Sequence, residues 1–187
     1  MEFRLTDVGL EPYFNNQDIR HLTEINAMSK PIENSFDLNN TNGLDLGCGK
    51  KKSLETAIGV DCVRGPTKPF GWLSFPDLIA RAEDLPFKDE TIDWITASHL
   101  IEHYENPVEV INEWLRVIKK QGVISMLIPI AEHTGKIGEP GTDATHKHDY
   151  SVEKFKTDVL DKIENINIIQ CKDVGIKWSM VATIQKI

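Results

Sequence analysis

The apolar residues of the chain follow helical spacing in some segments and form short continuous runs in others. Ile19, Leu22 and Ile25 recur at near-helical spacing, which predicts a helix over residues 16–29, and Pro31 is expected to end it. Four short apolar segments are typical of strands: residues 43–46, 57–61, 78–82 and 92–97.

A second helix is predicted to begin after Asn106. Pro107 fits the first helical position, and Asn106 and Glu109 have the spacing of a capping box. Gly122, which follows two lysines suited to a helix C-terminus, is expected to end it. The nearly all-apolar residues 123–130 then predict a central parallel strand that is covered on both faces.

The C-terminal part begins with a long segment, residues 131–150, which has three glycines and predicts a loop. Ser151 is expected to begin a helix, and residues 167–171 and 178–187 are predicted strands with a short connection, hence an antiparallel hairpin at the sheet edge. Alternation in the last strand predicts that one of its faces is wetter. Strands alternating with helices predict an α/β, Rossmann-like, doubly wound fold, with a mostly parallel sheet and helices on both faces.

Length and charge narrow the class of protein. A chain of 187 residues fits one domain, and its net charge of −8 leaves no basic footprint for nucleic acid. No apolar stretch approaches the ~20 residues that span a bilayer. The N-terminus lacks a signal core, and three cysteines do not make a disulfide framework. We therefore expect a cytoplasmic protein that binds neither nucleic acid nor membrane.

Ligand-binding residues are expected where the first two strands end, because ligands of parallel sheets bind beyond the carboxyl ends of the strands. Gly47 and Gly49 would let the backbone approach a ligand closely, and the start of a following helix would offer amides. Asp61, at the end of the second strand, could accept both ribose hydroxyls of an adenosine. Each feature alone also fits an ordinary turn, but together they favour a nucleotide-like ligand.

Four segments carry a family resemblance. They are Leu-Asp-Leu-Gly-Cys-Gly at 44–49, the stretch 82–93, Ser-His-Leu-Ile-Glu-His at 98–103, and the turn at 116–122, which has Lys-Gln where Pro-Gly is usual. Together they resemble the motifs of class I methyltransferases that use S-adenosylmethionine (SAM), most closely the small type 11 methyltransferases.

The resemblance implies how the chain would bind SAM. The glycine turn would hold the amino-acid end, Asp61 the ribose, and the segment from Ala82 the adenine, while Ser98 would lie beside the sulfonium. The expected SAM-binding residues are Asp45, Gly47, Cys48, Gly49, Asp61, Cys62, Ala82, Glu83, Asp84, Ser98 and His99.

Three departures from the family keep an alternative open. Lys51 stands at the usual third glycine, the first crossover is short, and Arg81 stands where an adenine-binding aspartate is common. The alternative is a SAM- or nucleotide-binding regulatory protein without methyl transfer. A nicotinamide-dependent oxidoreductase ranks behind both, because the chain lacks the third glycine of G-x-G-x-x-G.

Histidines are the candidate catalytic residues, since the pKa of an imidazole suits a general base. His99 lies just after a predicted strand, and His146 and His148 lie in a segment that resembles the acceptor side of the family. Residues 99–103 also fit the H-x-x-E-H zinc pattern, but His99 follows directly on a strand, so no metal site is predicted. Some quinone-pathway O-methyltransferases of the superfamily bind metal with Glu and His at this strand end, which leaves that alternative open.

The combined prediction is one methyltransferase domain that acts on a small-molecule acceptor as a monomer or homodimer, mainly by positioning it for in-line displacement. Its expected parts are an N-terminal helical segment (1–41), a SAM-binding core (42–130), an acceptor-side loop (131–150), and a C-terminal helix and hairpin (151–187). The loop is expected to be mobile and to close over the acceptor.

Overall fold

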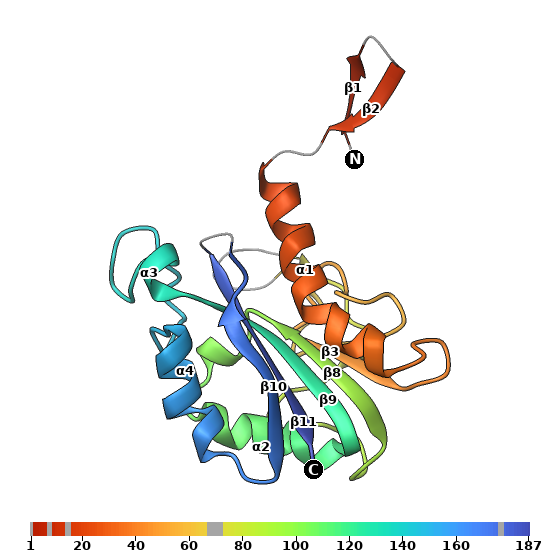
Figure 1. Cartoon of the computed structure of the whole chain (residues 1–187), viewed down its shortest axis with the longest axis vertical. Helices are drawn as coiled ribbons and strands as arrows, with labels where there is room; N and C mark the ends of the chain where they lie inside the picture. Colours follow the sequence, from red (N-terminus) through yellow and green to blue (C-terminus); the bar gives the residue numbers. More distant parts are fainter. Residues whose placement is uncertain (1, 7–8, 14–15, 67–72, 176–177) are drawn as a thin grey trace.

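The computed structural model describes residues 2–6, 9–13, 16–66, 73–175 and 178–187. Its main sheet has seven strands in the order β10-β11-β9-β8-β3-β4-β7 (Figure 1). Their bounds are β3 (Gly43–Leu46), β4 (Ile58–Asp61), β7 (Leu78–Ile79), β8 (Ile92–Ser98), β9 (Ile118–Pro129), β10 (Ile166–Asp173) and β11 (Ser179–Lys186).

Five neighbouring strands of this sheet, from β7 to β9, run parallel, whereas β11 is antiparallel to both β9 and β10. The predicted Rossmann-like sheet with a C-terminal antiparallel hairpin is therefore confirmed. Two smaller hairpins pair β1 (Glu2–Thr6) with β2 (Gly9–Tyr13), and β5 (Gly65–Pro66) with β6 (Leu73–Ser74).

Helices cover both faces of the main sheet (Figure 1). On one face α1 (Asn16–Ser35) packs on β8, β9 and β11, and its Met28 and Ile32 are fully buried. The other face carries α2 (Pro107–Val117) and α4 (Val152–Asp158), which bury Trp114 and Phe155. The short helices are η1 (Ile101–His103), α3 (Ala131–Thr134) and η2 (Leu160–Lys162). None of the described helices is long and apolar enough to cross a membrane.

The prediction that Pro31 ends the first helix is wrong, because α1 continues through Pro31 to Ser35. A proline inside a helix cannot donate to the carbonyl four residues earlier, which here belongs to Ala27. The side-chain amide of Gln170, on β10, donates to that carbonyl at 3.2 Å. A tertiary contact thus satisfies the group that the proline leaves without its helical partner.

The predicted boundary between the second helix and the central strand is also wrong. α2 ends at Val117, and β9 already begins at Ile118, so the two lysines lie in the strand. Gly122 does not end the helix. A Cβ at this position would lie 2.8 Å from the carbonyl oxygen of Asp93, and this close approach accounts for the glycine. Asn106 precedes the helix as expected, but its side chain makes no cap hydrogen bond.

Three smaller predictions need comment. Ser151 does cap α4, since its hydroxyl accepts from the backbone N–H of Lys154 at 3.1 Å. The residues after the glycine turn form turns and bends, and no helix follows β3 to offer amides to a ligand. The last strand has no wet face, because helices cover both sides of β11, and even Ser179 and Thr183 are buried.

Candidate functional site

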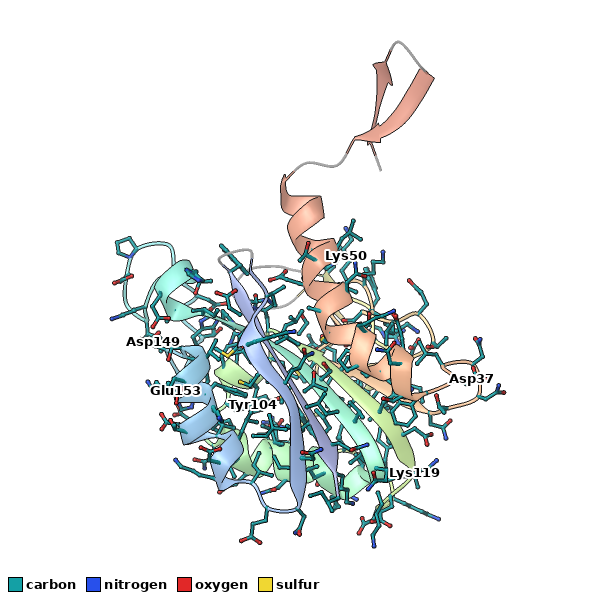
Figure 2. All side chains as sticks on the ribbon, viewed as in Figure 1. Asp37, Lys50, Tyr104, Lys119, Asp149 and Glu153 are labelled. Carbon is teal, nitrogen blue, oxygen red and sulfur yellow. The ribbon has the colours of Figure 1, made fainter. Side chains whose placement is uncertain are left out.

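The candidate site lies at the edge of the sheet where the parallel strands end. Lys50, just after β3, and Lys119, at the start of β9, mark opposite edges in Figure 2. Two cavities lie at the edge marked by Lys50. The smaller, of about 170 Å³, is lined by His21, Ile25, Asp45, Gly47, Cys48, Lys51, Lys52, Ser53 and Ser98.

The larger cavity, of about 540 Å³, is bounded by α1, the end of β8, η1 and the loop after α3. It is lined by His21, Glu24, Ser98, His99, His103, Pro129, Thr134, Gly135, Gly141, Thr142, Asp143, His146 and Trp178. Ser98, the last residue of β8, and His21 of α1 line both cavities, which therefore adjoin.

The glycine turn and the acid after the second strand lie together, as the motif order predicts. Gly47 and Gly49 have φ angles of +66° and +55°, in the left-handed region that favours glycine. The N–H of Gly49 donates to Asp61 Oδ2 at 3.2 Å, and the Ser74 hydroxyl donates to the same oxygen at 2.7 Å. The carboxylate at the end of β4 is thereby fixed against the turn.

Asp45 lies in β3, just before the glycine turn, and is hydrogen-bonded to the segment after the turn, where a helix was expected. The backbone N–H of Ser53 donates to its Oδ2 at 2.5 Å, and the Thr96 hydroxyl donates to Oδ1 at 3.0 Å. Burial raises the pKa of Asp45 to about 6, although the hydrogen bonds from Ser53 and Thr96 oppose the rise. Asp45 thus lines the smaller cavity and also fixes Ser53, another of its lining residues.

The two cysteines near the turn are not activated thiols. Cys48 is buried, and burial, followed by the charges of Asp45 and Asp61, raises its pKa to about 12. Burial and the neighbouring Asp61 also raise the pKa of Cys62. Cys48 thus shapes the smaller cavity by packing.

The segment expected to contact adenine lies outside the lining of both cavities. The carbonyl of Ala82 accepts a hydrogen bond from the Trp114 indole at 2.9 Å. Glu83 Oε1 accepts two from the Arg81 guanidinium, and Asp84 is exposed. Burial works against ionisation of Glu83, but its backbone hydrogen bond and Arg81 outweigh it and lower the pKa. Arg81, the departure from the family pattern, therefore serves to hold Glu83.

The structure brings two of the three candidate catalytic histidines to the larger cavity. His99 and His146 line it, together with His103, which the sequence analysis did not select. His148 is not among its lining residues, because its Nε2 lies 2.9 Å from the carbonyl oxygen of Tyr104 and its ring stacks on Tyr150.

His99 and His146 differ in electrostatics. Burial alone would lower the pKa of His99, but the carboxylates of Glu102 and Glu24, 3.7 and 3.8 Å away, raise it to about 9. Burial lowers the pKa of His146, because the nearby Glu102 compensates only in part. At neutral pH, His99 is therefore an imidazolium and His146 a neutral imidazole.

The loop after α3 is attached to η1 in this conformation. The N–H of Lys147 donates to the carbonyl of Glu102 at 2.8 Å, and the Thr145 hydroxyl lies 2.9 Å from His103 Nδ1. Sequence patterns indicated Glu102 and His103 through H-x-x-E-H and through the family-like segment at residues 98–103. The contributions of Glu24 and Asp143 to the cavity had no sequence signal, since they depend on how distant elements pack.

Comparison with known proteins gives a family match over part of the chain and a fold. Residues 44–126 match the family described as a methyltransferase domain. The chain is 26% identical over 180 residues to the uncharacterized protein MJ1123 of Methanocaldococcus jannaschii, covering 95% of this chain and 84% of that protein.

Two solved structures resemble the whole chain. The PH0226 protein from Pyrococcus horikoshii has a TM-score of 0.62 and 17% identity, over 98% of this chain and 95% of the other. A SAM-dependent methyltransferase from Thermotoga maritima, described as a possible histamine N-methyltransferase, has a TM-score of 0.58 and 20% identity, over 89% of each chain. At such identities these structures establish the fold.

Proposed function

We propose that this chain, whose residues 44–126 match a methyltransferase domain, is a class I SAM-dependent methyltransferase that transfers the methyl group of SAM to a small polar acceptor in the 540 Å³ cavity. One observation carries the proposal: Ser98, at the end of β8, lines both this cavity and the smaller one beside the glycine turn. The methionine part of a donor in the smaller cavity and an acceptor in the larger one would meet at Ser98.

The residues around the turn fit SAM. Gly47 and Gly49 leave the backbone accessible, Asp61 offers a carboxylate for ribose hydroxyls, and Lys51 lines the cavity where an α-carboxylate would be favoured. When bound, SAM supplies a methyl group on a positively charged sulfur that is already a good leaving group. The protein's main task is therefore to align the acceptor with the reacting bond.

The larger cavity suits a small molecule. Its volume of about 540 Å³ lies in the range of ~300–1,000 Å³ that is usual for such ligands. Imidazoles and the carboxylates of Glu24 and Asp143 line it, so polar groups of an acceptor would find hydrogen-bond partners there. The net charge of −8 further disfavours polyanionic acceptors.

An acceptor hydroxyl must lose its proton during the transfer, and we propose a cavity imidazole as its general base. His99 and His146 both line the cavity. The neutral state of His146 supports it over His99, whose imidazolium is held between Glu24 and Glu102. His148 contacts Tyr104 instead and provides a matched control.

The test is an assay with methyl-labelled SAM and a panel of small hydroxylated compounds, in which the formation of S-adenosylhomocysteine is measured. We expect one compound class to accept the label. His146→Ala should reduce turnover by about 10²-fold with unchanged SAM affinity, whereas His148→Ala should not. SAM binding without transfer to any acceptor would contradict the proposal and favour the regulatory alternative.

A further inference from the structure

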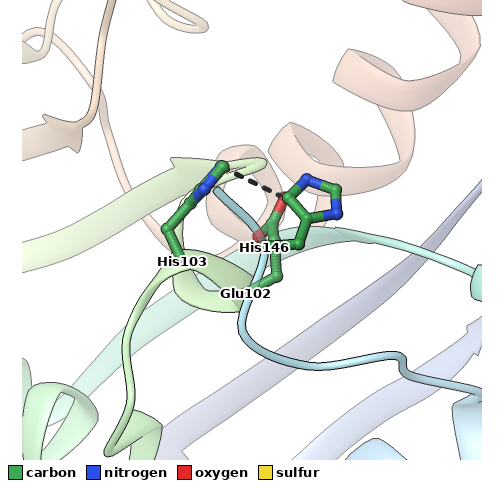
Figure 3. Close-up of side chains that lie close together, drawn as sticks. All are labelled: Glu102, His103 and His146. Atoms are coloured by element: carbon green, nitrogen blue, oxygen red, sulfur yellow. Dashed lines mark ion pairs between the residues drawn. The ribbon is translucent and has the colours of Figure 1, made fainter. Parts of the chain in front are cut away.

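Three side chains converge on one point in the wall of the larger cavity (Figure 3). Glu102 and His103 come from η1, and His146 comes from the loop that crosses it. Oε1 of Glu102 lies 3.9 Å from Nε2 of each histidine, and one ligand atom from each residue lies within 4.8 Å of the others. We name Glu102, His103 and His146 the histidine–glutamate cluster.

Glu102 has an unusual environment for a carboxylate. Its side chain is fully buried, and within the described residues neither of its carboxylate oxygens has a hydrogen-bond partner. A buried polar group without hydrogen bonds is costly, so native proteins rarely leave one uncompensated. The imidazolium of His99, whose Nδ1 lies 3.7 Å from Oε1, offsets part of the charge of Glu102. The imidazole nitrogens of His103 and His146 lie 3.9 Å from the same oxygen, which leaves a gap longer than a hydrogen bond.

A chain of hydrogen bonds orients His103 toward this gap. The Thr145 hydroxyl donates to Asp143 Oδ1 at 2.6 Å, so its oxygen is left to accept from His103 Nδ1 at 2.9 Å. In the neutral imidazole this network assigns the proton to Nδ1 and leaves a lone pair on Nε2. The lone pair of His103 then points to the gap beside Oε1 of Glu102, and a metal ion coordinated by both atoms would fill this gap.

We propose that the histidine–glutamate cluster binds a divalent first-row transition-metal ion. Two imidazoles and one carboxylate are ligands that ions such as Zn²⁺ and Co²⁺ accept, whereas Mg²⁺ and Ca²⁺ prefer oxygen alone. An ion ~2.1 Å from each atom would set tetrahedral ligands about 3.4 Å apart, so the cluster must contract by about half an ångström or more. Asp143 and Thr145 supply the outer hydrogen bonds that metal-binding histidines usually make.

The ion would have an open position toward the larger cavity, because His103 and His146 line that cavity. An acceptor oxygen bound there would lose its proton more easily, and His146 would then act as a ligand rather than as a base. This role rests on the proposed function, but binding of the ion does not.

The test measures Zn²⁺ binding by calorimetry on metal-stripped full-length protein, with Co²⁺ as a spectroscopic probe. We expect one ion per chain. His146→Ala and Glu102→Gln should each weaken binding by at least about 100-fold, and Thr145→Val by about 10–100-fold through the orientation of His103. His133→Ala is the matched control, because this histidine pairs with Asp173 outside the cluster.

Folding of each variant is checked by circular dichroism, and His146→Ala keeps the test decisive if the buried Glu102→Gln does not fold. No binding to the wild type, unchanged binding in folded His146→Ala, or a loss confined to His133→Ala would overturn the proposal. Methyl transfer is measured separately. Metal binding without transfer would contradict only the proposed function, and transfer without metal binding only the metal site.

Discussion

Replacement of Asp61 by alanine separates its role in the fold from its proposed role in ligand binding. The carboxylate already holds two groups of the protein, the N–H of Gly49 at 3.2 Å and the hydroxyl of Ser74 at 2.7 Å. The Ser74 hydroxyl also lies 3.3 Å from the carbonyl oxygen of Gly49, which remains in the variant. We therefore expect Asp61→Ala to lower the free energy of unfolding by only about 1–2 kcal/mol.

The expected loss of affinity is larger. A hydrogen bond between a carboxylate and a ligand hydroxyl contributes about 1.5–3 kcal/mol, and each 1.4 kcal/mol changes a dissociation constant about tenfold. If Asp61 binds the ribose, Asp61→Ala should weaken S-adenosylhomocysteine binding about 10–150-fold. Calorimetry gives the affinity, and urea denaturation gives the stability of the same samples.

Asp77 supplies the control. Its Oδ2 accepts from the N–H of Gly59 at 2.8 Å and from Lys52 Nζ at 3.0 Å, so it too fixes β4 through a backbone amide and one side chain. Neither aspartate is a lining residue of the two cavities, but Asp61 contacts the glycine turn, whereas Asp77 contacts Gly59 and Lys52. Asp77→Ala should therefore cost similar stability without a comparable loss of affinity. Equal losses of affinity in both variants would refute the assignment of Asp61 to the ribose.

Three further predictions concern the stability of the fold. S-adenosylhomocysteine at about 100 times its dissociation constant should stabilise the fold by about 2.7 kcal/mol, visible as a higher Tm; no shift at saturation would argue against the site. The folded-state pKa of Asp45, about 6, exceeds the ordinary value of 3.8 for an aspartate, so the unfolded chain binds fewer protons between these pH values. Stability should fall by up to ~3 kcal/mol as pH rises from about 4 to 6, and Asp45→Asn should reduce this fall in pH-dependent denaturation. Gln170→Ala should lower the free energy of unfolding by about 1 kcal/mol, because it removes the donor to the Ala27 carbonyl. This loss should be smaller in a chain that also carries Pro31→Ala, because a backbone N–H can then donate to that carbonyl. Equal losses in both backgrounds would contradict this account.

Local sequence patterns predicted the sheet well, because buried parallel strands and glycine turns leave strong signals over a few residues. The same patterns failed where contacts with distant residues determine the ends of a helix or strand. Gln170 allows α1 to continue through Pro31, and no window around the proline contains that glutamine. Helix propensity likewise extended the second helix past Val117, although pairing with β8 draws the following residues into β9.

The candidate site shows the same division. The glycine turn and Asp61 follow from motif order, since the turn directly follows β3 and Asp61 is the last residue of β4. The packing of His103 and His146 around Glu102 does not, because a loop more than forty residues away completes the group. The pattern at residues 99–103 contains Glu102 and His103, but its His99 is not in the cluster, and His146 is not in the pattern.

The contact between Glu24 and Ser179 joins two segments that are synthesised at very different times. Ser179 donates to Glu24 Oε1 at 2.5 Å across 155 positions of the sequence, and both lie beside His99. The apolar side of α1, including Met28, is therefore synthesised long before the strand that buries part of it, since β11 follows near the end of the chain. A ribosome-bound chain that stops before β11 would expose this side to chaperones and proteases. Because α1 and Trp178 both line the larger cavity, that cavity is completed only when these late residues join the early helix.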